Sequence, residues 1–234
     1  MIRLSRALDG LTELFYPRIC VGCGKRLLRD ESYLCLNCLS SLPLARVHET
    51  PDNFVEQHLY GFPYIESATT LMLFEKESAV QEVLHEIKYH GAKELARSMG
   101  RMLGRELRDG RFSSVDMIIP IPLHPNRLKW RGYNQSEWLS LGLSDEMGVP
   151  VRTDCVERVV ETSTQTKRNA EERWENVKGI FALKKDVPLD DFQGKHLLLV
   201  DDVITTGATV MACASALSSI ENVKLSVASL AAVN

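Results

Sequence analysis

The chain has 234 residues, of which 44% are hydrophobic and 25% charged, so it is able to bury one medium-sized domain plus a small appendage. Its formal net charge of -3 excludes a surface that attracts nucleic acid everywhere, and any such binding would need a local basic patch. No apolar run approaches the roughly 18 residues of a membrane-spanning helix, so we expect no membrane span.

The first residues of the chain form an amphipathic pattern. Leu4, Leu8 and Leu11 recur at helical spacing, with charged residues between them. A secretion signal needs a continuous apolar stretch, which this segment lacks. We therefore expect a short docked helix at the start of a cytoplasmic protein.

Two short cysteine motifs, CVGC and CLNC, follow this segment. Each motif bends the chain so that both of its sulfurs face one point, and four thiolates complete a tetrahedral zinc site. Two disulfides or reduced core thiols are the alternatives, and the absence of a secretion signal argues against disulfides. We predict that a structural Zn²⁺ binds at Cys20, Cys23, Cys35 and Cys38.

Strand and helix patterns alternate after the cysteine motifs. Strands are predicted over residues 67–74, 115–122, 195–200 and 223–233, and helices over 78–90, 92–110, 134–148, 170–179 and 208–220. This alternation favours an α/β fold with a largely parallel sheet flanked by helices. We expect a zinc-ribbon segment with its preceding helix over residues 1–62 and the α/β domain over residues 63–234.

The strand 197–200 has no polar face, which is typical of a central strand covered on both sides. Asp201 and Asp202 follow it, where open α/β sheets bind their ligands. The next residues lead into a helix, whose N-terminus offers free N–H groups and the positive end of the helix dipole to a phosphate. This predicted loop contains Thr205, Thr206, Gly207, Ala208 and Thr209.

Two carboxylates repel a phosphate unless something separates the groups. A ribose 5-phosphate provides that separation, because the loop holds its phosphate while Asp201 and Asp202 accept hydrogen bonds from its hydroxyls. Gly207 would let the backbone approach the anion closely, and the threonine hydroxyls would add donors. An ordinary turn, capped by Asp and filled by Thr, is the alternative. The order of acids and loop after an apolar strand favours the ribose-phosphate site.

A basic segment follows the strand at 115–122. It is predicted to be a loop that Pro120, Pro122 and Pro125 make rigid. A solvated basic loop is the alternative to a second wall of the site. Its positively charged or titratable residues are His124, Arg127, Lys129 and Arg131.

The acid-and-loop segment resembles the signature of type I phosphoribosyltransferases, which bind phosphoribosyl pyrophosphate (PRPP). It is not a Walker loop, because it lacks G-K-[ST]. The segments 87–96, 121–135 and 198–209 resemble the ComF family, and the further matching residues are Arg158, Gln165, Arg173, Asn176 and Phe181. One departure is Lys167-Arg168, where the family pattern has an apolar residue.

The resemblance implies a type I phosphoribosyltransferase-like fold, an N-terminal zinc ribbon and a link to DNA uptake in naturally transformable bacteria. In such an enzyme Arg127 and Arg131 would lie near the pyrophosphate of PRPP. Mg²⁺ would bind with PRPP, mainly through ligand oxygens and water. The implied partners are PRPP, single-stranded DNA and DNA-uptake or recombination proteins. The ribosyl acceptor is not identified.

Two other functions remain open at this point. The same residues fit a non-enzymatic module that senses PRPP or binds single-stranded DNA. They also fit a nucleobase-salvage phosphoribosyltransferase, which would need a base-specific apolar slot that the sequence does not locate.

Overall fold

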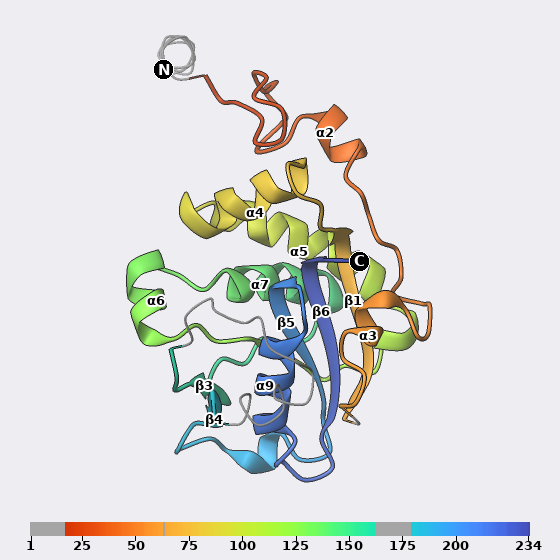
Figure 1. Cartoon of the computed structure of the whole chain (residues 1–234), viewed down its shortest axis with the longest axis vertical. Helices are drawn as coiled ribbons and strands as arrows, with labels where there is room; N and C mark the ends of the chain where they lie inside the picture. Colours follow the sequence, from red (N-terminus) through yellow and green to blue (C-terminus); the bar gives the residue numbers. More distant parts are fainter. Residues whose placement is uncertain (1–16, 63, 162–178) are drawn as a thin grey trace, which may run out of the picture.

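The central layer of the molecule is a parallel sheet (Figure 1). The computed structural model describes residues 17–62, 64–161 and 179–234. Within these residues the main sheet has the strand order β1-β6-β5-β2, and each neighbouring pair is parallel. The strands are β1 (Ile65–Leu73), β2 (Met117–Pro120), β5 (His196–Ile204) and β6 (Lys224–Ala232).

Helices cover both faces of this sheet. Leu198 and Val200 of β5 belong to one buried cluster, whereas Leu197 and Leu199 belong to a second cluster on the opposite face. The first face is covered by α4 (Ala79–Tyr89), α5 (Lys93–Leu107) and α7 (Gln135–Met147), and the second by α3 (Phe54–Gln57) and α9 (Ala208–Leu217). The predicted parallel sheet flanked by helices is therefore confirmed.

Shorter elements connect this core. They are α2 (Leu36–Ser40), α6 (Pro125–Arg131), the antiparallel pair β3 (Val156–Arg158) and β4 (Phe181–Leu183), and two 3-10 turns at Gly110–Phe112 and Leu189–Asp191. The predicted N-terminal helix and all but the last residue of the predicted helix 170–179 lie outside the described residues. Gln165, Lys167, Arg168, Arg173 and Asn176 also lie outside them.

The differences from the sequence prediction include two element boundaries and one element type. The helix expected to stop at Gly110 is α5, which ends at Leu107. The strand expected to end at Val200 continues to Ile204, because β6 goes on pairing with it. The basic segment after β2 is a helix rather than a loop, and Pro125 occupies its first turn, where proline's fixed φ is compatible with a helix.

Helices α5 and α7 meet at glycines. A Cβ atom on Gly100 would collide with the carbonyl oxygen of Leu139, and one on Gly142 would collide with the carbonyl oxygen of Arg97. The two backbones therefore approach more closely than larger residues would permit. This contact fixes the position of α7, whose first turn reaches the candidate site.

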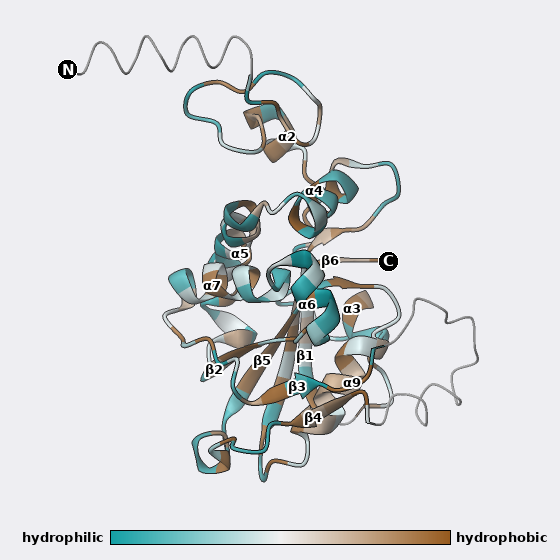
Figure 2. Cartoon of the chain, turned by 90° about the vertical axis from the view of Figure 1, so that its left-hand side faces the viewer, coloured by the Kyte–Doolittle hydropathy of each residue, from teal (hydrophilic) through white to brown (hydrophobic). Residues whose placement is uncertain are grey.

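The cysteine segment lies at one end of the molecule, beside α4, in both views (Figure 1 and Figure 2). Its buried residues Cys20, Leu27 and Leu34 belong to the same apolar cluster as Val80 of α4. The division of the chain at residues 62 and 63 stays a prediction. None of the helices in the described part of the chain has the length and apolar character needed to cross a membrane.

Candidate functional site

The two adjacent acids project beyond the end of a neighbouring strand. β2 stops at Pro120, which pairs with Val200, while β5 continues beside β6 and pairs Asp201 with Ser229. Asp201 and Asp202 are thus inside strand β5, but they occupy the edge where β2 has ended. This is the carboxyl edge of the sheet, where α/β proteins bind ligands.

Asp202 is held by two groups from different helices. The Gln135 side-chain amide donates from Nε2 to Asp202 Oδ2 at 2.6 Å. Lys88 Nζ of α4 lies 3.3 Å from the same oxygen. Asp202 is 7% exposed, so this charge is largely removed from water and is compensated locally.

Asp201 has weaker compensation. The Asp202 backbone N–H donates to its Oδ1 at 2.8 Å, and the Ser136 hydroxyl lies 3.4 Å from the same atom. Burial, followed by the neighbouring charge of Asp202, raises the pKa of Asp201 to about 7. The pair therefore combines a well-compensated carboxylate with one that takes up a proton near neutral pH.

The predicted turn into a helix begins only after Ile204, because β5 includes the two residues that follow the acids. Thr205 and Thr206 are exposed, and α9 begins at Ala208. Gly207 caps the helix with φ 73°, in the left-handed region that favours glycine. A Cβ at this position would lie 2.7 Å from Leu59 Cδ2 and 2.9 Å from the His58 carbonyl oxygen. The position therefore requires glycine for its backbone angle and for its contact with the end of α3, independently of any ligand.

Arg127 and Arg131 lie on the same short helix, α6, and have different surroundings. Burial, and next the charge of Arg127, lowers the pKa of Arg158 on β3, while Asp201 acts on it in the opposite direction. Arg127 and Arg158 thus lie in one electrostatic neighbourhood with Asp201. The guanidinium of Arg131 instead lies over the ring of Tyr89, 5.6 Å from its centroid.

Sequence reasoning did not single out Lys88 or Ser136 as contacts of the acids. Asn134 caps α7, because its side chain accepts a hydrogen bond from the Ser136 backbone N–H at 3.1 Å. Gln135 instead reaches Asp202, and its buried Oε1 has no hydrogen-bond partner among the described residues. The available signal was the position of these residues in the first turn of a helix that follows β2.

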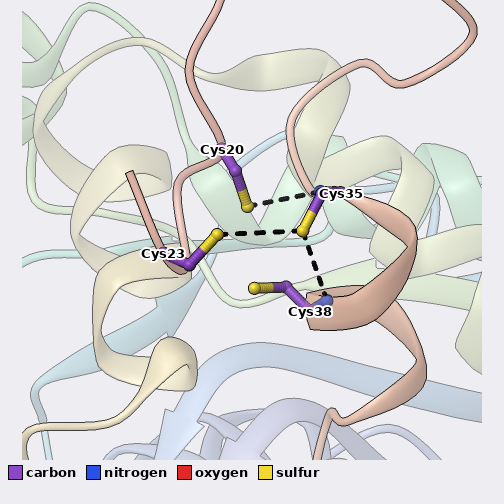
Figure 3. A group of neighbouring side chains, drawn as sticks. All are labelled: Cys20, Cys23, Cys35 and Cys38. Carbon is purple, nitrogen blue, oxygen red and sulfur yellow. Dashed lines mark hydrogen bonds between the residues drawn. The ribbon is translucent and has the colours of Figure 1, made fainter. Parts of the chain in front are cut away.

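The four cysteines predicted to bind metal come together (Figure 3). Their Sγ atoms all lie within 4.8 Å of one another, and all four thiols are free. The sulfurs of Cys23 and Cys35 are 3.8 Å apart, which is not a disulfide distance. The Cys35 backbone N–H donates to Cys20 Sγ at 3.2 Å, so backbone donors also face the sulfurs.

The surroundings of the sulfurs shift the pKa values of two of these thiols in opposite directions. Burial raises the pKa of Cys20, but backbone hydrogen bonds from Cys35, Cys23 and Gly22 outweigh it and lower that pKa to about 6. Burial and the neighbouring thiols raise the pKa of Cys38. Four sulfur ligands with this proximity fit tetrahedral Zn²⁺ and leave no open coordination position.

The fold is that of an α/β protein with two acids at the carboxyl edge of its parallel sheet and a four-cysteine cluster that could hold a metal ion. No family model matches the chain. It is 33% identical over 205 residues to competence protein F of Haemophilus influenzae, covering 84% of this chain and 89% of that protein. It is 31% identical over 201 residues to the DNA utilization protein YhgH of Salmonella typhi, covering 82% of this chain and 80% of that protein. The chain therefore belongs to the competence protein F family.

Solved structures that resemble the chain include phosphoribosyltransferases. A hypoxanthine phosphoribosyltransferase from Staphylococcus aureus has a TM-score of 0.37 and 16% identity, covering 68% of this chain and 73% of that one. An adenine phosphoribosyltransferase from Trypanosoma brucei has a TM-score of 0.39 and 13% identity, covering 67% and 69%. A likeness at this level carries no argument about the ligand.

Proposed function

We propose that the chain binds PRPP at the edge of the sheet formed by Asp201 and Asp202. The observation that carries this proposal is the pair of carboxylates beyond the end of β2, followed two residues later by an exposed threonine turn and the N-terminus of α9. The carboxylates would accept hydrogen bonds from ribose hydroxyls. The turn from Thr205 to Thr209 would hold the 5-phosphate through backbone and hydroxyl donors.

Positively charged side chains near Asp201 support the pyrophosphate part of the proposal. Two arginines, Arg127 and Arg158, lie close enough for the charge of one to lower the pKa of the other. A pyrophosphate beside these two guanidinium groups would be attracted by both. Arg131 remains a second candidate for the pyrophosphate. Its buried Nε has no hydrogen-bond partner among the described residues.

The proposed chemistry is phosphoribosyl transfer. As pyrophosphate leaves, the C1 carbon of the ribose gains oxocarbenium character, so no protein nucleophile is required. The chain would contribute by orienting the sugar and stabilising charge. Mg²⁺ would be held mostly by the oxygens of PRPP and by water. The ribosyl acceptor is open, and a protein that binds PRPP without turnover would use the same contacts.

We propose that this activity serves DNA uptake or DNA handling in the cytoplasm. The support comes from relatives named competence protein F and DNA utilization protein YhgH, which match most of this chain. We also propose that the four cysteines hold a structural zinc ion. Its support is the convergence of four free thiols in one cluster.

Titration calorimetry with paired variants tests the PRPP site. We expect Asp201→Asn/Asp202→Asn to weaken PRPP binding about 10- to 100-fold, because hydrogen bonds to charged acceptors are lost. Binding of inorganic phosphate should be kept or improved, since phosphate has no ribose hydroxyls and meets less negative charge. The exposed acid pair Asp190→Asn/Asp191→Asn is the matched control and should bind PRPP like the parent.

The same titrations with and without Mg²⁺, followed by assay of released pyrophosphate, separate binding from turnover. The acceptors to test are single-stranded DNA, nucleobases and amines. Parent-like PRPP affinity in the Asp201→Asn/Asp202→Asn variant would show that the acids serve the fold and would overturn the proposed site.

A further inference from the structure

Aromatic rings gather on the surface beside the candidate site, at the ends of α4 and α6. Trp130 is 71% exposed and Tyr89 is 52% exposed. Their ring centroids are 5.9 Å apart in an edge-to-face arrangement. His85 lies 4.9 Å from the Tyr89 ring and 5.0 Å from the ring of His90. We call Trp130, Tyr89, His85 and His90 the aromatic patch.

Burial does not account for this patch. Two large rings left mainly in water cost the protein solubility and contribute little to the core. The fold nevertheless holds the two rings in place, because Tyr89 and Trp130 lie at the ends of α4 and α6 and a buried hydrogen bond joins these ends. Tyr133, just beyond α6, donates its buried hydroxyl to the Ile87 carbonyl of α4. This hydrogen bond joins the two helix ends and keeps the rings side by side.

Positive charge surrounds the rings. Arg131 lies against Tyr89, and Lys129 is exposed on the same short helix. One acid next to the patch, Glu86, is engaged by His90 at 2.7 Å. Rings that alternate with cations match a ligand that alternates flat bases with phosphates. Single-stranded nucleic acid has this chemistry.

We propose that the aromatic patch is a stacking platform for the bases of single-stranded nucleic acid, with Trp130 and Tyr89 as its stacking residues. Lys129 and Arg131 contact the phosphates on either side. The platform adjoins the PRPP site, since Lys88 pairs with Asp202 while its neighbour Tyr89 belongs to the patch. The inference rests on the proposed role in DNA handling and does not require phosphoribosyl transfer. Stacking of the bases would add to the attraction between the phosphates and the neighbouring cations.

Fluorescence anisotropy with a labelled oligothymidine tests the platform. We expect Trp130→Ala to lower affinity about tenfold at every salt concentration, with an unchanged slope of log affinity against log salt. Lys129→Gln should instead reduce that slope by roughly one. Trp130→Phe keeps an aromatic face and should retain most of the affinity, whereas Trp130→Leu should not. Tyr60→Ala, which removes a tyrosine that is 61% exposed elsewhere, is the control and should bind like the parent.

An abasic strand of equal length separates the platform from the wider proposal. If the parent protein binds the abasic strand more weakly than the oligothymidine, base stacking is supported. Equal binding to both strands, or parent-like affinity in Trp130→Ala, overturns the platform and leaves DNA handling through charge in place. If the protein binds neither strand, both the platform and the proposed DNA handling are overturned.

If thymidine monophosphate competes as well as the oligothymidine at the same concentration of bases, the patch is a site for free nucleotides. A change of oligomeric state in Trp130→Ala with unchanged DNA affinity would indicate a protein contact, and either result overturns the proposal. PRPP affinity should stay at the parent value in Trp130→Ala.

Discussion

Asp201 and Asp202 are adjacent in sequence but differ in their electrostatic surroundings. Asp202 receives an amide hydrogen bond and a lysine charge, whereas Asp201 receives a backbone N–H and a distant hydroxyl. Burial and the charge of Asp202 raise the pKa of Asp201, so this carboxyl takes up a proton near neutral pH. A ligand that brings Mg²⁺ or hydroxyl donors would compensate Asp201 and release its proton.

The first prediction concerns stability against pH. The pKa of Asp201 rises from its ordinary value of 3.8 to about 7, so the folded chain binds more protons than the unfolded chain between these values. Stability should therefore fall as pH rises through this window, by on the order of 2 kcal/mol between pH 5 and pH 7. Asp201→Asn should remove this contribution and make the ligand-free protein more stable at pH 8. Urea unfolding at several pH values measures this pH dependence of the unfolding free energy. If the unfolding free energy changes with pH in the same way in the parent and in the variant, the prediction is contradicted.

The second prediction concerns Gly207. Alanine there meets an unfavourable positive φ and also the backbone and side chain of residues 58 and 59. We expect Gly207→Ala to lose about 2–4 kcal/mol of unfolding free energy. Gly194 is the matched control, because it has φ 67° but no atom within 4 Å of the place where an alanine methyl group would lie. Gly194→Ala should lose only about 1 kcal/mol, and equal losses in thermal or urea unfolding would show that the α3 contact is unimportant.

At the residue scale, the sequence predicted what lies close together in the chain. Asp201 and Asp202 come directly after the apolar run of β5, and the threonine turn follows the end of that strand, so local pattern was sufficient to find them. Lys88 and Gln135 are far from the acids in sequence, and only the packing of α4 and α7 against β5 brings them together. The steric need for Gly207 was missed for the same reason, since its neighbours belong to α3 and the residues just after it.

At the scale of elements, hydrophobic periodicity was enough to find the main helices and strands. It did not find the true end of β5, because the pairing with β6 extends that strand beyond its apolar residues. It also missed α6, a helix whose apolar residues Leu128 and Trp130 are exposed and therefore form no buried stripe. Gly132 ends α6 with φ 79°, and His124 caps its start.

The third prediction concerns the packing of α5 against α7. Gly142→Ala would push a methyl group into the Arg97 carbonyl, so the helices must separate. We expect a loss of about 2–3 kcal/mol in unfolding free energy. PRPP binding should also weaken, because α7 carries Gln135 and Ser136 to the acids. Gly104→Ala is the graded control: its Cβ would lie 3.0 Å from the Glu146 side chain and 3.1 Å from the Leu143 carbonyl oxygen, which are milder contacts. Equal stability of the Gly142 variant and the parent would count against the close approach.

At the scale of the whole molecule, the cysteine segment and the α/β domain share a core. Leu27 and Leu34 pack in the same cluster as Val80 and Val83 of α4. A Cβ on Gly22 would lie 3.2 Å from Cys38 Sγ and 3.3 Å from the Ala79 side chain, so the cysteine cluster lies directly against the start of α4. The sequence motifs predicted the cluster but not this contact, which depends on the tertiary fold. A metal ion held by this cluster would thereby be coupled to the helix that carries Lys88 to the candidate site.

The fourth prediction follows from this shared core. The purified protein should contain a single zinc ion per chain, and Cys23→Ser should lose it. Removing the metal breaks the bonds that hold the two cysteine motifs together, so the segment should loosen and withdraw its leucines from α4. Hydrogen exchange should then rise in α4 as well as in residues 20–38, while β5 and β6 stay protected. Cys155→Ser is the control, because Cys155 is buried away from the cluster and should leave the zinc content unchanged. Faster exchange confined to residues 20–38 would show that the cysteine segment folds independently of the α/β domain.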